Sequence, residues 1–199
     1  GLLLILLIVL QNPYLNFETI SIDVPSYLVA SQNVGFSELP FEKQWESKGP
    51  LFIYMYKFLS YLSSKNLVLF KLLNDLLLYA TALLIFQISL IKSRNITASF
   101  FSTIFFICIT SHVWYVAELS EIYCLVFIIY QYYLITKYEL NNKIIFFSSL
   151  LISLSSLINQ ASGIFLLGLL FIVYRKKGIK ENIKSYISII FGFIIPHLF

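Results

Sequence analysis

The chain has 199 residues, of which 59% are hydrophobic and only 12% are charged, and its mean hydropathy is +0.84. A soluble domain carries about 25% charged residues, so this chain has too much apolar surface for a single aqueous core. Its net charge of +4 is small, and we attribute the basic residues to membrane topology rather than to nucleic-acid binding. The composition therefore predicts an all-α polytopic membrane protein.

Apolar runs long enough to form helices follow one another along the chain. In order, they cover residues 2–10, 51–63, 66–91, 97–113, 120–136, 144–158, 161–174 and 183–199. The chain begins with Gly1 and ends inside an apolar run, so we interpret it as the N-terminal part of one membrane domain, with a truncated first span at 1–10 and a missing C-terminal part. The polar stretch 11–50 is longer than any later loop and rich in proline and acidic residues. It predicts a large outer loop at 11–65 with short surface helices, followed by the remaining spans.

The positions of the basic residues indicate which runs cross a membrane. A spanning helix needs about 20 residues, so 66–91 is long enough and 51–63 is short. If 51–63 lies on the membrane surface, all later basic turns fall on one side, as the positive-inside rule requires. If it spanned, Lys92 and Arg94 would lie opposite the basic cluster at Arg175. The expected spans are then seven, at 1–10, 66–91, 97–113, 120–136, 183–199 and a short pair within 144–174 that is either two spans or a re-entrant hairpin.

This topology also predicts where chemistry can take place. The basic turns are cytoplasmic, and the long loop, Glu118, Glu121 and Asn159 face outside. The composition, with little Gly and many Ile, Phe, Asn and Lys residues, is typical of an AT-rich bacterial genome. We therefore expect an integral protein of a bacterial plasma membrane whose active site faces away from the cytoplasm.

Asp23 is the first candidate for a chemical role. It precedes Pro25, which suits the first turn of a short helix that runs to about Gly35. A carboxylate just ahead of a helix N-terminus stays ionised because the helix dipole favours its charge, and an ionised carboxylate can act as a general base. The alternative interpretation is a plain helix cap.

The stretch Lys48-Gly49-Pro50 begins the next apolar run. Gly49 lets the backbone approach a ligand closely, and Pro50 starts the helix. Lys48 is a cation near a helix N-terminus, where the dipole disfavours it, so this position needs an anion. A lipid phosphate would complete such a site, and the alternative is a lysine that reaches out to lipid head groups.

Two further pairs of charged residues are associated with the spans. Glu118 and Glu121 lie at the outer end of their span, where one of them faces the same cavity as Asp23 or both are solvated. Lys71 and Asp75 lie one turn apart inside the second span, so we expect them to form a structural ion pair.

Several stretches occur in an order that resembles a known enzyme family. They are Asp23-Val-Pro-Ser-Tyr27, Glu46-Ser-Lys48-Gly-Pro50-Leu51, Lys71-Leu72, Glu121 at the start of a span, and Asn159-Gln-Ala-Ser-Gly163 before a span that ends in basic residues. Together they resemble the N-terminal half of the GT-C glycosyltransferases, which include the protein O-mannosyltransferases and bacterial enzymes that transfer sugars to lipid A and lipopolysaccharide. The chain departs from the family at Val24, which replaces a second acid, at Gly49, which replaces a proline, and at Asn159, which replaces a lysine.

The resemblance implies a GT-C-like transmembrane core and a glycosyltransferase that moves a hexosyl or pentosyl group from a polyprenyl-phosphate donor to an acceptor hydroxyl on a protein, lipid or cell-envelope glycan. Asp23 matches the family's catalytic base, and Lys48 would hold the donor phosphate. Glu46, Glu121 and Tyr27 would shape the cavity, bind the acceptor or hold a divalent metal, and the departures leave the metal requirement open. The implied partners are the lipid bilayer and the lipid-linked donor, without nucleic acid.

Two other functions fit parts of the sequence. A multi-span transporter or lipid flippase would have polar residues in mid-membrane and paired broken helices. Lys71 and Asp75 fit the first feature, and the short pair within 144–174 fits the second. A receptor-like scaffold would leave Asp23 and Lys48 replaceable. The long acidic loop and the KGPL helix start favour the transferase.

Overall fold

The computed structural model of the chain describes residues 1–11, 23–35, 48–111, 119–177 and 183–198. Every regular element in these ranges is a helix, so the all-α prediction is confirmed for them. The α-helices are α1 (Leu2–Gln11), α2 (Asp23–Asn33), α3 (Pro50–Leu62), α4 (Leu67–Ser93), α5 (Ile96–Thr110), α6 (Ser120–Lys137), α7 (Asn142–Ser156), α8 (Phe165–Lys177) and α9 (Ile183–Ile194). The short 3-10 helices are η1 (Gln160–Ile164) and η2 (Ile195–Leu198).

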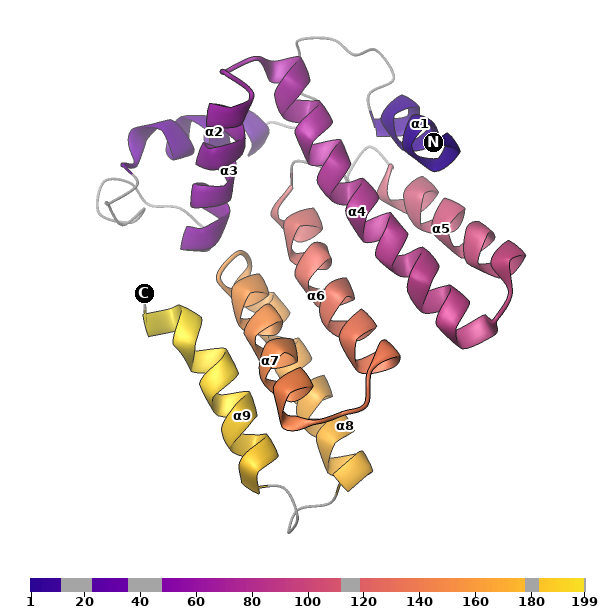
Figure 1. Ribbon diagram of the computed structural model, residues 1–199. Helices are drawn as coiled ribbons and strands as arrows, with labels where there is room; N and C mark the ends of the chain where they lie inside the picture. The colour runs from indigo at the N-terminus through magenta and orange to yellow at the C-terminus, as the bar shows by residue number, and fades with distance from the viewer. Residues whose placement is uncertain (12–22, 36–47, 112–118, 178–182, 199) are drawn as a thin grey trace.

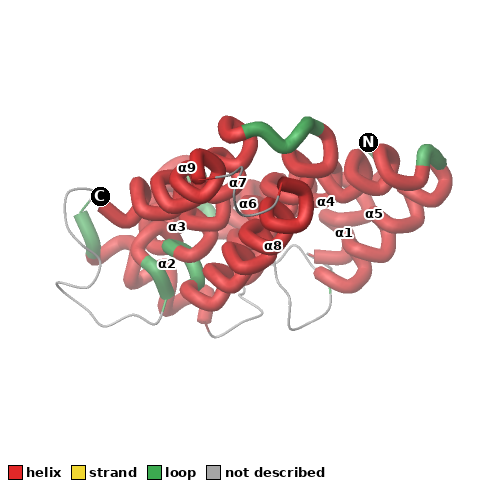
Figure 2. Tube along the Cα trace, turned by 90° about the horizontal axis from the view of Figure 1, so that it is seen from below, coloured by secondary structure: helices red, strands yellow, loops and turns green. Residues whose placement is uncertain are grey.

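The longer helices form an antiparallel bundle (Figure 1). α4 packs against α5 and α6, α6 packs against α7, and α7 packs against α9 and, less extensively, α8. Three helices end at the same end of the bundle with basic residues in their last turn, and we call this the basic end. These residues are Lys92 of α4, Lys137 of α6 and Arg175 of α8. α2, α3 and the turn 157–160 lie at the opposite end, which we call the loop end. Seen from below, the helices spread from α1 and α5 on one side to α9 on the other (Figure 2).

Asparagine caps set the start of three helices. Asn66, Asn95 and Asn141 each accept a hydrogen bond from the backbone N–H three residues later, at 3.1, 3.1 and 2.9 Å. Such a side chain satisfies one of the free N–H groups of the first turn, so α4, α5 and α7 begin directly after these residues. The observed helices agree with the predicted apolar runs to within a few residues, except that α8 begins later because η1 precedes it.

A cluster of aromatic rings, which we call the aromatic cluster, joins α2 and α3 to the bundle. Its rings are buried and meet at centroid distances of 4.7–5.8 Å, in edge-to-face or tilted pairs. Its members are Tyr27 of α2, Phe52 and Tyr56 of α3, Phe70 of α4 and Tyr123 of α6. Because the edge of one ring is positive and the face of the next is negative, these pairs add to the stabilisation from burial. Large, rigid side chains therefore hold the predicted surface helices in place.

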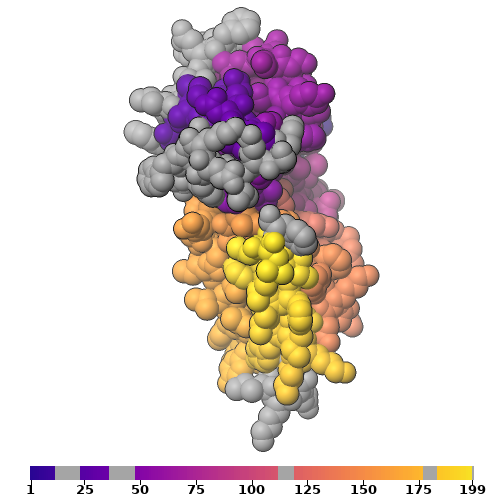
Figure 3. Space-filling model, turned by 90° about the vertical axis from the view of Figure 1, so that its left-hand side faces the viewer, coloured from indigo at the N-terminus to yellow at the C-terminus, as the bar shows by residue number. Residues whose placement is uncertain are grey.

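The interface between α7 and α9 combines buried isoleucines with small residues that let the two backbones approach. Ser149 Oγ and Ser153 Oγ each donate a hydrogen bond of 2.6 Å to a backbone carbonyl of α9. An added Cβ atom at Gly192 would stand 2.5 Å from the Phe146 carbonyl oxygen, so the two backbones approach closely. Contacts of this kind are typical of helices that pack against each other in a membrane. α9 itself lies along the surface of the bundle, with α2 above it at the loop end (Figure 3).

One described helix, α4, is both long enough and apolar enough to cross a membrane, by length and composition alone. The shorter apolar helices are α1, α5, α7 and the segment formed by α9 and η2. The pair predicted within 144–174 is present as α7 and α8, joined by η1. The helical architecture is thus confirmed for the described residues, and the seven membrane spans remain a prediction.

Candidate functional site

Three side chains from distant parts of the sequence meet at the loop end. Lys48 directly precedes the N-cap of α3, Glu121 lies in the first turn of α6, and Asn159 is the N-cap of η1. The Lys48 Nζ atom lies 3.2 Å from Glu121 Oε1, and Asn159 Nδ2 donates a hydrogen bond of 3.3 Å to the same oxygen. We call these three residues the Glu121 cluster.

Backbone hydrogen bonds join the segments that carry the Glu121 cluster. The Gly49 N–H donates to the Ile158 carbonyl at 2.9 Å, and the Leu51 N–H donates to the Leu157 carbonyl at 3.1 Å. A Cβ atom at Gly49 would stand 2.0 Å from the Leu157 oxygen, so only glycine permits this contact. The close backbone approach expected at Gly49 is therefore made to the turn before η1.

Asn159 both starts η1 and reaches the Glu121 carboxylate. Its Oδ1 atom accepts a hydrogen bond of 3.2 Å from the Ala161 N–H, as an N-cap residue does. This bond orients the amide so that Nδ2 faces Glu121. The lysine that the resembled family carries at this position could not accept the capping bond, because an ammonium group has only donors.

Glu121 is well placed for a negative charge. It lies in the first turn of α6, where the free N–H groups and the helix dipole favour an anion. Ser120 Oγ donates a hydrogen bond of 3.0 Å to Oε2, so both carboxylate oxygens of Glu121 have partners. The Lys48 and Glu121 side chains are 22% and 49% exposed, and a partly solvated pair contributes about 0–1 kcal/mol. Backbone contacts therefore position the cluster more than the ion pair does.

The anion that the sequence required beside Lys48 is present in the chain itself. The unfavourable dipole at the start of α3 led to the prediction of a phosphate there. In the structure the Glu121 carboxylate occupies that place. An ammonium group has three donors and Lys48 remains partly exposed, so the ion pair leaves the phosphate contact of Lys48 as a prediction.

The other predicted site residues are placed differently. Asp23 is the first residue of α2 and is exposed, as expected for a carboxylate at a helix N-terminus. It is not among the residues that the contacts of the Glu121 cluster join. Tyr27, one turn later, is buried in the aromatic cluster, so its ring contributes to packing. Glu46 and Glu118 lie outside the described residues.

A second polar group is buried beside the aromatic cluster. Lys71, Asn74 and Asp75 of α4 are all buried, while the expected ion pair between Lys71 and Asp75 stays a prediction. Tyr123 Oη donates to Asn74 Oδ1, and Asn74 Nδ2 donates to a backbone carbonyl one turn earlier at 2.8 Å. The sequence interpretation missed Asn74 and Tyr123. An amide inside an apolar helix is the signal that could have found them, because a buried amide needs a hydrogen-bond partner.

Within the ranges that the structure describes, no group of three or more His, Cys, Asp or Glu residues is placed to hold a metal ion. Cys124 is buried and Cys108 is exposed, and both thiols are free. The proposals for function therefore rest on the lysine, carboxylate and amide groups described above. In comparisons with known proteins, no protein-family model, no curated protein and no solved structure matches the chain.

Proposed function

We propose that this protein is a membrane glycosyltransferase of the GT-C type, which moves a sugar from a polyprenyl-phosphate donor to an acceptor hydroxyl on the outer face of the membrane. The observation that carries the proposal is the Glu121 cluster. Lys48, Glu121 and Asn159 come from three separate motifs of the resemblance, yet Lys48 Nζ and Asn159 Nδ2 lie 3.2 and 3.3 Å from the same oxygen of Glu121. A cation and a carboxylate held together at this end suit recognition of a phosphate and a sugar hydroxyl.

Three features of the bundle support its place in a membrane. Large apolar side chains such as Phe101, Phe105 and Phe171 are exposed on its helices, as on a surface that meets an apolar phase. The basic residues that close α4, α6 and α8 share one end, as the positive-inside rule requires. The serine and glycine contacts between α7 and α9 add close backbone approach to the hydrophobic burial of this interface, which is common between helices in lipid.

In the proposed reaction, the acceptor hydroxyl attacks the anomeric carbon of the donor sugar. The bond between that carbon and the lipid phosphate oxygen breaks, and its electron pair leaves with the phosphate. Asp23 accepts the proton of the hydroxyl as general base, and Lys48 stabilises the negative charge on the departing phosphate. Glu121 keeps Lys48 oriented, because Asn159 and Ser120 in turn hold the Glu121 carboxylate.

The test uses the full-length protein in vesicles that contain a radiolabelled polyprenyl-phosphate sugar, and it measures loss of label from the lipid. Asp23→Asn keeps a capping side chain but removes the base, so we expect transfer to fall about 10²–10⁴-fold. Lys48→Gln should slow transfer about 10²-fold by removing one charge-stabilising donor. Ser26→Ala is the matched control, since its exposed hydroxyl donates to the backbone carbonyl of Asp23 at 2.7 Å and not to its carboxylate. Equal transfer by the wild type and Asp23→Asn would remove Asp23 from the mechanism.

A transporter or lipid flippase is the second candidate, and the buried polar residues of α4 favour it. Lys71 and Asp75 lie buried near the start of the one described helix that is long and apolar enough to span a membrane. Ionisable residues in such a helix commonly mark a transport path. The same vesicles separate the two functions, because a flippase moves the labelled lipid between leaflets without releasing its sugar.

A further inference from the structure

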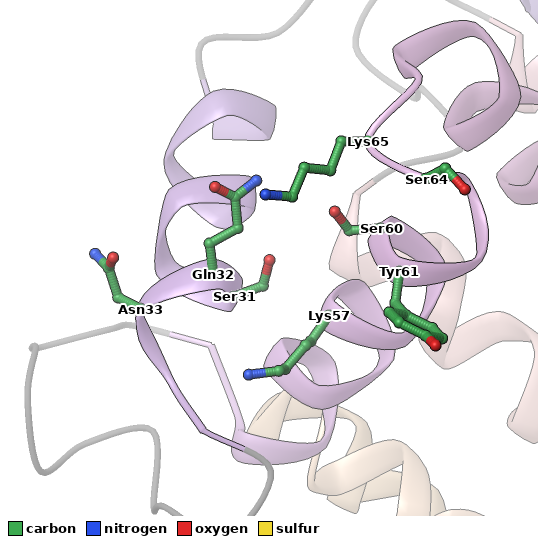
Figure 4. Close-up of a pocket in the computed structure, with 8 residues that line it drawn as sticks. All are labelled: Ser31, Gln32, Asn33, Lys57, Ser60, Tyr61, Ser64 and Lys65. Carbon is green, nitrogen blue, oxygen red and sulfur yellow. The ribbon is translucent and has the colours of Figure 1, made fainter.

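The two ends of the bundle differ in how their positive charges are balanced. At the loop end, Lys48 faces the Glu121 carboxylate, and α2 and α6 each have an acidic residue in their first turn. Lys57 lines a cavity of about 640 Å³ between α2 and α3 (Figure 4), and it donates a hydrogen bond to the Val34 carbonyl just after α2. The C-terminal end of a helix is the negative end of its dipole, so this lysine also has a partner within the chain.

The cations of the basic end are not balanced in this way. Glu139 is the one carboxylate that the structure describes among them, and within the described ranges it forms no ion pair with any of them. The exposed cations of this end are Lys92, Arg94, Lys137, Lys143, Arg175, Lys176 and Lys184.

The helices that begin at the basic end add to its positive charge. α5, α7 and α9 start there, and none of them has an acidic residue in its first turn. The free N–H groups of a first turn carry a partial positive charge. Lys143 and Lys184 lie in the first turns of α7 and α9, where the dipole disfavours a cation. An anionic partner at this end would remove the repulsion between these charges.

Tyrosines rather than carboxylates hold two of these lysines. Lys92 donates a hydrogen bond to Tyr132 Oη, and its Nζ atom lies 4.6 Å from the centre of that ring, which joins the end of α4 to α6. Lys137 donates to Tyr133 Oη at 2.5 Å, and its Nζ atom lies 5.3 Å from the centre of the Tyr138 ring. A phenol oxygen and a ring face orient an ammonium group without neutralising its charge, and each ammonium group has three donors. Both cations are therefore held in place before an anion binds, which lowers the entropy cost of binding.

The exposed side chains around these cations indicate which anion fits. Tyr132, Tyr138 and Tyr174 are 36, 46 and 50% exposed, and Ile96 and Ile183 at the starts of α5 and α9 are each 69% exposed. Tyrosine is enriched where a protein meets the boundary between lipid and water, because its ring is apolar and its hydroxyl is polar. A nucleic acid would leave these apolar side chains in water. A phosphate attached to acyl chains matches both the cations and the apolar side chains beside them.

We infer that the basic end binds the phosphate groups of anionic phospholipids. Lys92 and Lys137 contact the phosphate oxygens, and the exposed tyrosines lie beside the first part of the acyl chains. The inference rests on the proposed place of the bundle in a membrane but not on sugar transfer, because none of these residues belongs to the Glu121 cluster. Lipid binding and transfer can therefore fail separately.

The test titrates the purified full-length protein in neutral detergent and measures affinity by calorimetry. The ligands are short-chain phosphatidylglycerol, short-chain phosphatidylcholine, inorganic phosphate and a short RNA. We expect phosphatidylglycerol to bind most tightly, and Lys92→Gln and Lys137→Gln each to weaken its affinity about fivefold, as expected for the loss of one cation beside lipid phosphates. Lys92→Arg keeps the charge and should keep the affinity. Lys65→Gln removes an equal charge from an exposed lysine at the loop end and should change nothing.

Each comparison in this titration decides something. Phosphatidylcholine that binds as tightly as phosphatidylglycerol would overturn the role of the charge, and inorganic phosphate that binds as tightly would overturn the lipid assignment. RNA that binds more tightly and displaces phosphatidylglycerol would assign the basic end to nucleic acid instead. A loss in Lys65→Gln as large as that in Lys92→Gln would show that only net charge matters. Unchanged affinity in both Lys92→Gln and Lys137→Gln, with unfolding temperatures equal to that of the wild type, would also overturn the inference.

Discussion

The loop end and the interface between α7 and α9 join helices by different means. At the loop end, the buried rings of the aromatic cluster hold α2 and α3 onto α4 and α6. Between α7 and α9, serines and a glycine bring two backbones together. The first contact depends on the volume of its side chains, whereas the second, beside its buried isoleucines, also needs small side chains where the two backbones approach. Removing volume should therefore damage the loop end, and adding volume should damage the α7–α9 interface.

Loss of a central ring should have the largest effect. Tyr56 is 0% exposed and packs against Phe52, Phe70 and other rings of the aromatic cluster. Tyr56→Ala should lower the free energy of unfolding by about 3–5 kcal/mol, because it removes buried area and leaves a cavity. The measurement is denaturant unfolding of the full-length protein in mixed micelles. Tyr61→Ala on the exposed face of α3 is the control and should change it by less than about 0.5 kcal/mol. Equal losses would show that the aromatic cluster does not hold α3.

Gly49 is the exception at the loop end, where added volume should also be harmful. Gly49→Ala puts a Cβ atom 2.0 Å from the Leu157 carbonyl oxygen, so the start of α3 must move away from the turn before η1. We expect a loss of about 2–3 kcal/mol in the free energy of unfolding, together with slower sugar transfer because Lys48 moves with Gly49. Gly168→Ala, where the added carbon would meet nothing within 4 Å beyond the local backbone of its own helix, is the matched control. A Gly49→Ala protein as stable and active as the control would contradict the docking of this segment.

Gly192→Ala tests the α7–α9 interface in the same way. The added Cβ atom would stand 2.5 Å from the Phe146 carbonyl oxygen and 3.0 Å from Ser149 Cβ. α9 lies along the surface of the bundle and can shift outward, so we expect a smaller loss of about 1–2 kcal/mol in the free energy of unfolding. Unfolding of the purified variant in mixed micelles measures it, again against Gly168→Ala. An unchanged stability would mean that close backbone approach does not stabilise this interface.

The smallest change in stability should follow from Glu121→Gln. The variant loses the charge that faces Lys48 but keeps side-chain oxygen and nitrogen atoms near Asn159 and Ser120. Because the pair is partly exposed, the free energy of unfolding should fall by only about 0–1 kcal/mol. The rate of transfer from a polyprenyl-phosphate sugar should fall although the protein stays nearly as stable as the wild type, because Glu121 no longer orients Lys48. A loss of stability as large as that of Tyr56→Ala would assign Glu121 to the packing of the loop end instead.

Local signals in the sequence account for most of the observed helices. Pro50 starts α3 as predicted, and the asparagines before α4, α5 and α7 cap them with their own side chains. The carboxylate of Asp23 also lies at the start of a helix, as its neighbours indicate. These features depend on residues within a few positions of each other, so a single stretch of sequence is enough to predict them.

Contacts between distant segments could not be predicted in this way. Lys48 and Glu121 are 73 residues apart, and no local pattern around either residue indicates that they form an ion pair. Gly49 was expected to face a ligand and instead meets the backbone before η1. Tyr27 was a candidate for a cavity and is part of the aromatic cluster. In each case the partner depends on which helices become neighbours, and no local pattern specifies that.

The sequence by itself determined the helices and their ends, because the hydrogen bonds within a helix join neighbouring residues. It also determined that basic residues gather in alternate turns, because a charge is costly to bury and is therefore placed between the apolar segments. Only the tertiary structure decided which polar side chains share a site. The Glu121 cluster exists because α3, α6 and η1 meet at the loop end, and the cavity between α2 and α3 exists because these two helices pack side by side. Both arrangements follow from the burial of aromatic rings between helices. The free energy of this burial is gained only when the helices pack together, so no single segment of sequence specifies it.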